Sequence, residues 1–337
     1  MEQRVKRLSL LRLSRVAREQ GEAKHKNTPE MNIKLIYRTS LNNNRMVRIS
    51  IITATLNSER TLRHTLDSIL RQTYRNYELI IKDCASQDET LSICKEYEPR
   101  FEGRMRVIAV PDCGLYDAMN QGIAAATGDV VGMLNSDDFF TAPDILMTIA
   151  RTFEAHPEID AVYGDVHYVE EENPARIVRY YSSRLFRRYW MRMGFMPAHP
   201  SFYCRKMTYE RFRINGREIE GFKGNPDCAY FNTSYRIAAD FENLLRMIFL
   251  GRIAIRYIRR DFVTMRTGGA SSSGAASHRQ INRDHMRAFR ENGVYSNHFL
   301  ISFRYCYKIL EFAVVRYRRL LKLLPYKKYV KVQENIG

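Results

Sequence analysis

The stretch DVVGMLNSDD, residues 129–138, decides the fold, because an apolar run leads directly into a cluster of polar and acidic residues. Two earlier stretches have the same form, VRISIITATLN at 47–57 and YELIIKD at 77–83. Short apolar runs of this kind are typical of strands that are buried on both faces. Stretches with helical periodicity separate them. The alternation therefore predicts an α/β fold with a mainly parallel, Rossmann-like sheet and helices on both faces.

The other predicted elements follow outward from this stretch. Up to residue 170 we expect strands over 47–55, 77–83, 105–110, 129–134 and 161–169, and helices around 62–70, 88–97, 115–126 and 143–155. Beyond it the pattern is mixed, with strands near 177–181, 201–204 and 252–265 and helices near 185–191, 238–250, 278–292 and 297–324. In such sheets ligands bind beyond the carboxyl ends of the strands.

Acidic side chains follow three of the predicted strands, namely Asp83, Asp112 and the pair Asp137-Asp138. Carboxylates on one edge of a sheet repel each other, and they usually persist because a cation or a set of ligand hydroxyls holds them. Carboxylates are also the ligands that Mg²⁺ and Mn²⁺ prefer. The residues alone leave a second interpretation open, in which Asp88 and the Asp137-Asp138 pair only cap the helices that follow.

Charge is distributed unevenly along the chain, which has 54 Lys and Arg, 37 Asp and Glu and a net charge of +17. Residues 1–48 and 283–337 each carry 12 basic and 4 acidic side chains, whereas residues 49–282 carry 30 and 29. Basic ends suit an anionic surface such as a membrane leaflet. A nearly neutral core argues against contacts along a phosphate backbone, so we expect no nucleic-acid partner.

The cysteines and the two ends of the chain indicate the cellular compartment of the protein. Six scattered cysteines without a CxxC pair exclude a zinc ribbon and favour a reducing cytosol. An uncharged apolar stretch of roughly 18 residues is lacking, so no ordinary transmembrane helix is predicted. Residues 1–46 are interpreted as a basic arm, either disordered or lying before a true start at Met46. The tail over 276–337 interleaves apolar and basic residues, which favours an interfacial helix on anionic lipid, although docking on the rest of the fold explains it too.

Four motifs, taken in this order and spacing, resemble those of the family 2 glycosyltransferases. They are Thr53-Ala54-Thr55-Leu56-Asn57, Asp83 with Ser86, Asp88 and Thr90, the run Gly114-Leu115-Tyr116-Asp117-Ala118-Met119-Asn120-Gln121-Gly122, and Asn135-Ser136-Asp137-Asp138. Members of this family are inverting enzymes of the GT-A fold that use nucleotide-sugar donors. The resemblance covers about residues 47–270 and is to the bacterial branch that builds polysaccharides and surface glycans.

The resemblance implies a donor site at the ends of the first four strands. Its substrate-binding residues would be Thr53, Thr55, Asn57, Asp83, Ser86, Asp88, Tyr116, Asn120, Asn135 and Asp137. Among them, Asp83 resembles the acid that contacts the nucleoside, and Tyr116 and Asn120 match positions that face the donor sugar and diphosphate. The family often has two glycines after this acid, where Cys84 and Ala85 stand here. That departure puts the tightness of the nucleoside turn in question, but not the site itself.

The resemblance also implies the catalytic groups. Asp138 resembles the family's direct metal ligand, so the expected cofactor is a divalent cation, Mn²⁺ or Mg²⁺. Asp240 falls where the family has the Asp of a Glu-Asp pair that supplies the catalytic base, with Ala239 in place of the Glu and Glu242 as a reserve. His199 matches a position close to the acceptor site. From the residues alone, Asp240 could instead compensate a helix dipole and His199 could be a structural hydrogen-bonding residue.

We therefore expect a catalytic domain over 47–275, with a nucleotide-sugar-binding half at 47–140 and an acceptor half at 141–275. The expected activity is inverting transfer from a nucleotide sugar, UDP-sugars being favoured, to a hydroxyl of a glycan or lipid-linked acceptor. The expected location is the cytoplasm, at the inner face of the plasma membrane. Two other classes stay open: an idle nucleotide-binding scaffold of the same fold, and a nucleic-acid-binding protein, which would need a basic core surface.

Overall fold

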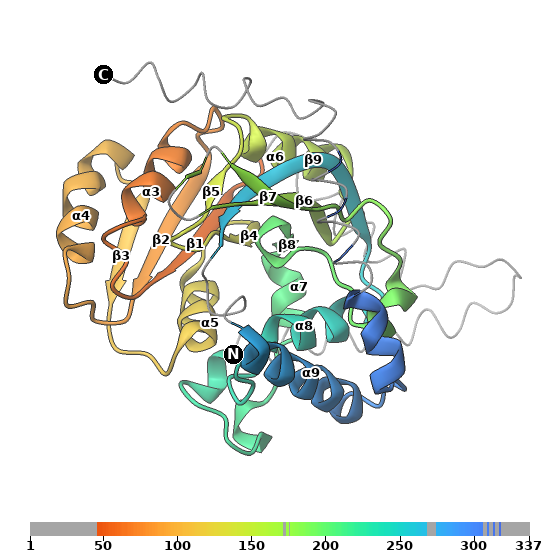
Figure 1. Cartoon of the computed structure of the whole chain (residues 1–337). Helices are drawn as coiled ribbons and strands as arrows, with labels where there is room; N and C mark the ends of the chain where they lie inside the picture. The colour runs from red at the N-terminus through yellow and green to blue at the C-terminus, as the bar shows by residue number, and fades with distance from the viewer. Residues whose placement is uncertain are drawn as a thin grey trace, which may run out of the picture. The chain divides into compact units, whose positions relative to one another are not determined.

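The first four strands confirm the predicted alternation of strands and helices (Figure 1). β1 (Ile49–Thr55) lies between β2 (Tyr77–Asp83) and β4 (Val130–Met133), β3 (Met105–Ala109) lies outside β2, and each of these pairs is parallel. The helices of this half are α3 (Leu62–Leu70), α4 (Thr90–Tyr97), α5 (Leu115–Ala125) and α6 (Ile145–Ala155). The sequence pattern thus located these elements to within a few residues.

The computed structural model describes residues 46–170, 173–174, 176–267 and 274–305, together with 309, 313 and 317. The predicted N-terminal arm up to residue 45, the glycine- and serine-rich run at 268–273 and most of the tail after residue 305 lie outside the described residues.

The second half of the sheet is mixed. β8 (Tyr203–Arg205) runs antiparallel between β4 and β6 (Ala161–Val169), and β9 (Ile255–Arg266) pairs in parallel with β6. β5 (Phe139–Phe140) and β7 (Ile177–Tyr181) form antiparallel edges on β9 and β6. The strand predicted over 161–169 therefore does not extend the parallel sheet, because β8, which comes later in the chain, lies between it and β4.

Each face of the sheet packs on its own hydrophobic core. Successive residues of a strand point to opposite faces, so Ile51 of β1 packs with α3, α4 and α6, while Ile52 packs with α5 and with two later helices, α8 (Ala239–Leu244) and α9 (Gly274–Glu291). Both side chains are buried. The helices cover both faces, as a largely buried parallel sheet requires.

Several elements after residue 170 differ from those predicted. The helix expected over 185–191 is a 3₁₀ turn at Arg188–Met193, and α7 (Lys206–Arg211) was not expected. The helix expected over 238–250 begins as α8 and continues as a π-helix from Leu245 to Leu250. Segments of π-helix are rare and occur frequently at functional sites.

The helix α9 packs against α8 and is part of the main body. Ala288 and Phe289 are buried in the second core, and the rings of Phe241 and Phe289 meet edge to face at 5.4 Å. The expected boundary between residues 275 and 276 falls in the first turn of this helix. Residues 298–305 are also helical, and Ile301 among them is buried. No helix within the described ranges is long and apolar enough to cross a membrane.

A buried lysine fixes the edge of the sheet where β2 and β3 end. Lys82 Nζ donates to the carbonyls of Asp83 and Val110, at 2.9 and 2.6 Å, and forms an ion pair with the Asp112 carboxylate at 2.8 Å. Both charged side chains are almost completely buried. Removing one partner of such a pair typically costs about 3–5 kcal/mol, so this contact sets the path of the loops after β2 and β3.

Candidate active site

The predicted site residues gather at the carboxyl ends of the parallel strands. The chain runs from β1 outward to β3 and then returns to the other side of β1 as β4, so the strand order reverses at β1. Loops on the two sides of such a switch point diverge and leave a crevice for a ligand. The loops after β1, β2 and β4 and the start of α5 all lie at this edge.

Asp83 ends β2 and holds the first two loops together. Its carboxylate accepts hydrogen bonds from the hydroxyl of Thr55 at 2.9 Å, and from the Ser86 amide at 2.8 Å and hydroxyl at 2.6 Å. Asp83 is completely buried. It therefore shapes the pocket from beneath the loops, and its direct contact with a nucleoside stays a prediction.

Asn57 and Asp88 join the loop after β1 to the loop after β2. The Asn57 amide donates to Ser86 Oγ, and the Asn57 side-chain oxygen accepts from the Gln87 amide, both at 2.9 Å. Asp88 accepts from the amides of Glu59 and Thr90, each at 3.0 Å. Asp88 thus accepts from the amide of the first residue of α4, whose N-cap is Glu89, and it also ties the two loops together.

The turn after Asp83 keeps a tight path in spite of its missing glycines. Ala85 has φ +51°, in the left-handed region that glycine adopts without strain. A residue with a Cβ atom pays roughly 1–2 kcal/mol there. The turn therefore carries backbone strain at Ala85 that a glycine at this position would not have.

We expect Ala85→Gly to stabilise the protein by up to about 1 kcal/mol, because relief of the left-handed strain exceeds the larger entropy loss of glycine on folding. A change of 1 kcal/mol corresponds to about 2–4 °C in Tm for a domain of this size. Thermal unfolding measures it. The matched control is Ala124→Gly on the exposed side of α5, which should lower Tm. An Ala85→Gly protein that melts at or below the wild-type temperature contradicts the assignment of strain.

The loop Asn135–Asp138 follows β4 and is held from α3. The Thr65 hydroxyl lies 2.9 Å from the carbonyl oxygen of Ser136 and 2.7 Å from that of Asp138. Ser58 Oγ, from the loop after β1, lies 2.9 Å from Ser136 Oγ. Within the loop, the side-chain nitrogen Nδ2 of Asn135 donates to Asp138 Oδ2 at 3.1 Å. The structure thus brings Asn135, Asp138 and the first loop together.

Asp138 has the electrostatics of a cation ligand. Burial raises the pKa of this carboxyl well above its ordinary value, and the charge of Asp137 raises it further, against the opposing effects of the Asn135 hydrogen bond and Arg266. A cation would relieve both the burial cost and the repulsion between the carboxylates. No group of three or more His, Cys, Asp or Glu side chains in the described part of the chain could hold a metal. Asp137 and Asp138 are instead an adjacent pair of acids in the loop after β4.

Arg266, at the end of β9, brings a positive charge to the same loop. Its guanidinium lies 5.5 Å from the centre of the Phe139 ring, and its Nη2 lies 2.7 Å from His64 Nδ1. Burial, together with the charges of Arg266 and Arg71, lowers the pKa of His64 to about 4. His64 is therefore neutral near pH 7 and accepts the hydrogen bond from Arg266.

Asp240, Tyr116 and His199 form a second cluster. The Tyr116 hydroxyl donates to the carbonyl of Ile237 and lies 3.5 Å from Asp240 Oδ1. Burial raises the pKa of Asp240, and the nearby His199 opposes this shift. Burial likewise lowers the pKa of His199, and Asp240 opposes that shift. Residues from α5, α8 and the 3₁₀ turn at His199–Ser201 thus bring the Asp240 carboxylate close to the Tyr116 hydroxyl and within electrostatic reach of His199.

Glu242, the expected reserve base, belongs to a different environment. It lies two residues after Asp240, about 200° further around the helix. Its carboxylate forms an ion pair with Arg246 Nε at 2.6 Å and accepts a hydrogen bond from the Asn292 amide at 3.4 Å. The structure therefore gives Glu242 no place in the cluster around Asp240.

Two predicted site residues lie beneath the site. Thr53 is completely buried within β1, and its hydroxyl has no hydrogen-bond partner among the described residues. The Asn120 side chain accepts from the amides of Tyr230 and Phe231, at 3.1 and 2.7 Å, and donates to the Phe231 carbonyl at 2.9 Å. Asn120 therefore holds the 230–231 backbone, and its contact with a donor stays a prediction.

The structure adds residues that the sequence analysis missed. Lys82 orders the loops after β2 and β3, Thr65 holds the Asn135–Asp138 loop, and Arg266 brings charge to it. One signal was available: a single lysine at the end of an otherwise apolar strand is rare unless it is paired. Thr65 and Arg266 carried no signal, because they contact the loop only in the folded chain.

Comparison with known proteins agrees with the resemblance to the family 2 glycosyltransferases. The sequence profile described as "Glycosyl transferase family 2" matches residues 50–214. A "PGL/p-HBAD biosynthesis glycosyltransferase" of Mycobacterium bovis is 42% identical over 117 residues, which are 35% of this chain and 46% of that protein. This chain thus aligns with about half the length of such curated relatives. The match of the family profile includes Asp83, Asp138 and His199, and Asp240 lies beyond its end.

The fold is also similar to that of solved structures. Residues 1–349 of TarS from Staphylococcus aureus superpose with a TM-score of 0.51 at 16% identity, covering 72% of this chain and 65% of that one. The same TarS fragment in complex with UDP gives 0.50 at 15% identity with the same coverage. These likenesses establish an α/β fold of the GT-A kind. Residues 50–214, just under half of the chain, match the profile of glycosyl transferase family 2.

Proposed function

We propose that the protein transfers a sugar from a nucleoside-diphosphate sugar to an acceptor hydroxyl, with inversion at the anomeric carbon. The observation that carries the proposal is the Asp240 carboxylate beside Tyr116 and His199. Tyr116 lies in the first turn of α5, after β3, so this cluster belongs to the same edge of the sheet as the loop that contains Asp138. A base and a site for the donor diphosphate at the same edge of the sheet suit a single displacement at the anomeric carbon.

In this mechanism Asp240 is the general base. As the acceptor oxygen forms its bond to the anomeric carbon, its proton passes to the Asp240 carboxylate. The bond from the anomeric carbon to the diphosphate oxygen breaks, and the nucleoside diphosphate leaves with that electron pair. A raised pKa makes the carboxylate a stronger base than an ordinary aspartate. The hydroxyl of Tyr116 lies 3.5 Å from it and can orient it without neutralising it.

The donor diphosphate would lie at the Asn135–Asp138 loop. Asp138, with Asp137 beside it, would hold a divalent cation, Mn²⁺ or Mg²⁺, which when bound neutralises charge on the departing diphosphate. Asn57, Ser86 and Asp83 would shape the nucleoside pocket. Because a TarS fragment was solved with UDP, UDP-sugars are the first donors to test. A hydrolysis screen of UDP-, GDP- and dTDP-sugars with Mn²⁺ tests the proposal, and a lack of cleavage or transfer with every donor contradicts it.

We expect kcat to fall as the pH is lowered, and to do so at a higher pH than it would if the base were an aspartate with an ordinary pKa. The base works only when it is ionised, so activity is complete above the Asp240 pKa and is lost as the pH falls through it. Tyr116→Phe removes a hydrogen bond that lowers this pKa, so the acid limb should move to still higher pH. Profiles of kcat against pH for both proteins measure this. A limb near pH 4, the ordinary aspartate pKa, or a downward shift in the variant, contradicts the base assignment.

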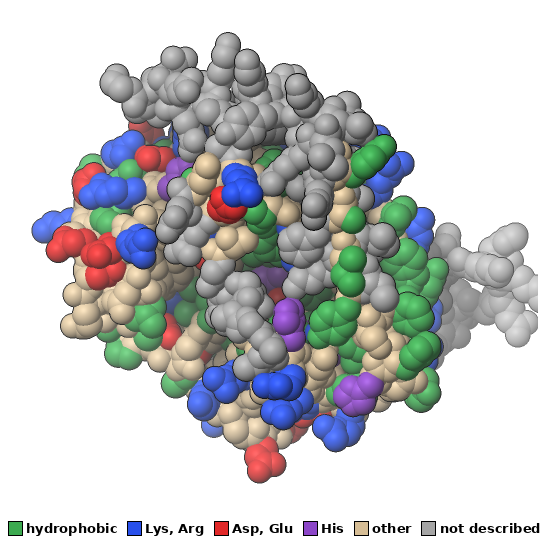
Figure 2. All heavy atoms as spheres, in the orientation of Figure 1, with side chains coloured by type: hydrophobic (Ala, Val, Ile, Leu, Met, Phe, Trp, Pro, Cys, Tyr) green, Lys and Arg blue, Asp and Glu red, His purple; other side chains and the backbone are tan. Residues whose placement is uncertain are grey.

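We also propose that the protein binds the cytoplasmic surface of an anionic membrane, where a lipid-linked acceptor would lie. Support comes from the helical residues 298–305. Phe299 and Phe303 are 71% and 44% exposed, with ring centres 5.3 Å apart, whereas Ile301 is buried in the core. Figure 2 shows apolar side chains close to Lys and Arg side chains along the right-hand edge of the molecule. Exposed aromatic rings near basic residues suit the headgroup region.

Replacing both Phe299 and Phe303 with Asp in the full chain is expected to release the protein from anionic vesicles, because two inserting rings become charges that the lipid repels. Co-sedimentation with phosphatidylglycerol vesicles measures it, and added salt should weaken wild-type binding. This pair is preferable to a deletion from residue 294, because Val294 and Ile301 belong to the core. Met207→Asp, at another exposed apolar position, is the control. Equal sedimentation of the double variant and the wild type contradicts the proposal.

A further inference from the structure

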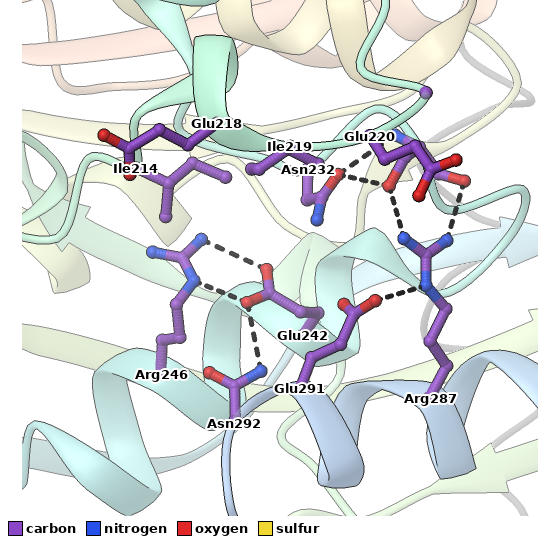
Figure 3. Close-up of a pocket in the computed structure, with 12 residues that line it drawn as sticks. Ile214, Glu218, Ile219, Glu220, Asn232, Glu242, Arg246, Arg287, Glu291 and Asn292 are labelled. Carbon is purple, nitrogen blue, oxygen red and sulfur yellow. Dashed lines mark hydrogen bonds and ion pairs between the residues drawn. The ribbon is translucent and has the colours of Figure 1, made fainter.

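A second pocket lies on the side of α8 that faces α9. It is a hollow of about 760 Å³ between the loop 214–221, the segment 232–234, α8 with its π-helical continuation, and α9. Figure 3 shows side chains from all four segments around it. We call it the α8–α9 pocket. Glu242 lines it, whereas Asp240 on the same helix contacts Tyr116, so the pocket and the proposed base lie on different sides of α8.

The charged groups of the α8–α9 pocket are held in place. Arg246 pairs with Glu242 at 2.6 Å, and Arg287 pairs with Glu291 at the same distance. The Tyr235 hydroxyl donates to Glu291 Oε2 at 2.5 Å. Both guanidinium groups are therefore already compensated, so the pocket offers an anion no free positive charge.

Two further acids disfavour an anionic ligand. Glu218 and Glu220 lie on the loop that closes the pocket, so the acids of the lining outnumber its arginines. A nucleotide diphosphate would be repelled. The α8–α9 pocket is thus unsuited to the donor and calls for a neutral ligand.

Uncommitted hydrogen-bonding groups point to the kind of neutral ligand. Asn232 is 5% exposed, and its side-chain oxygen accepts from the amide and hydroxyl of Ser234 at 3.0 and 2.6 Å. Its amide nitrogen has no hydrogen-bond partner among the described residues, and it projects into the pocket in Figure 3. Asn292 uses its amide nitrogen on Ala288 and Glu242, and within the described chain its oxygen accepts no hydrogen bond. The Asn232 nitrogen and the Asn292 oxygen are thus free to bond a neutral ligand that lies in the hollow.

We propose that the α8–α9 pocket binds a neutral saccharide. Each sugar hydroxyl both donates and accepts, so the hydroxyls of a saccharide suit both the Asn232 amide nitrogen and the Asn292 oxygen. Ile214 and Ile219 give the lining an apolar surface for the C–H face of a pyranose ring. The volume lies within the range of roughly 300–1,000 Å³ typical of ligand pockets. Identifying this saccharide as the part of the acceptor glycan remote from the reacting hydroxyl rests on the proposed function, whereas the binding itself does not.

Saturation-transfer NMR on the full chain tests the proposal, with maltose, cellobiose, mannobiose and N,N′-diacetylchitobiose as probes. We expect at least one disaccharide to receive saturation from the wild-type protein. Asn232→Asp keeps the acceptor that Ser234 needs and removes the free donor, so the signal should fall several-fold. Ile219→Trp should fill the hollow and abolish the signal. Leu185→Trp, at an exposed leucine outside the pocket lining, is the matched control and should keep it.

Each outcome decides the question. A lack of signal with all four disaccharides overturns the proposal, and so does an undiminished signal in both pocket variants. Circular dichroism shows whether each variant is folded, and the two variants perturb different walls, so one misfolded protein leaves the other as the test. Calorimetry of UDP with Mn²⁺ examines the donor site separately. Saccharide binding without UDP binding would overturn a UDP-dependent activity and leave the pocket assignment standing.

Discussion

Asp240→Asn is expected to lower turnover by about 10²-fold to 10⁴-fold, the range in which a general base contributes. The amide keeps the shape of the carboxylate and its contact with Tyr116, but it cannot take the proton of the acceptor hydroxyl. Donor affinity should change little, because the donor diphosphate is proposed to lie at the Asn135–Asp138 loop. Initial rates at saturating donor and acceptor measure the effect, and calorimetric UDP binding checks the donor site.

Asp227→Asn is the matched control for this experiment. Asp227 pairs with Arg217 at 2.7 Å, and both side chains are 65% exposed, so removal of its charge should leave turnover unchanged. If Asp240→Asn retains turnover close to wild type, the base lies elsewhere and His199 is the next residue to replace. A loss of UDP binding equal to the loss of turnover would instead assign Asp240 to the donor.

Asp138→Ala is expected to abolish metal-dependent donor binding. The carboxylate is the buried member of the acidic pair, and without it a divalent cation loses its fixed protein ligand. Calorimetry of UDP with and without Mn²⁺ measures the loss. UDP binding by the variant that still depends on Mn²⁺, at wild-type affinity, contradicts the assignment of Asp138.

A stability measurement supplies an independent readout at the same residue. The raised pKa of Asp138 means that the folded protein binds its proton more tightly than the unfolded chain does, so this residue lowers stability as the pH rises through that range. In the presence of a chelator near pH 7, Asp138→Asn should therefore melt above the wild type. Mn²⁺ should raise the wild-type Tm, by mass action on the folded state, and leave that of the variant unchanged. A chelated variant that melts below the wild type would show that the carboxylate stabilises the fold without a metal.

The first half of the fold was predictable because its signals are local. Strands β1, β2 and β4 are short apolar runs that end in polar residues, and the acids at those ends gather wherever parallel strands share an edge. The family resemblance assigned Tyr116, His199 and Asp240 to separate roles and did not predict that they form one cluster. Spacing alone did not predict it, since the three residues lie on separate elements.

The rest depended on contacts between distant parts of the chain. The three residues of β8 carry no periodicity that predicts their place between β4 and β6. Asn120 was assigned to the donor, yet its amide is used by the backbone of 230–231, which only tertiary packing brings to it. The α8–α9 pocket likewise arises where helices far apart in sequence meet. Such features follow from the packing of completed elements, which no sequence window contains.

The position of β8 also bears on the order in which the chain acquires structure during synthesis. β1 to β4 can associate as soon as residue 133 has left the ribosome, but the free side of β4 stays unpaired until Tyr203–Arg205 emerges. β6 leaves the ribosome in between and cannot complete its place, because its partners β8 and β9 follow it. Exposed apolar strand edges are prone to pair with other chains. The nascent protein between residues 133 and 205 is therefore the form most in need of a chaperone, and shortened versions that end in this interval should be the most prone to aggregate.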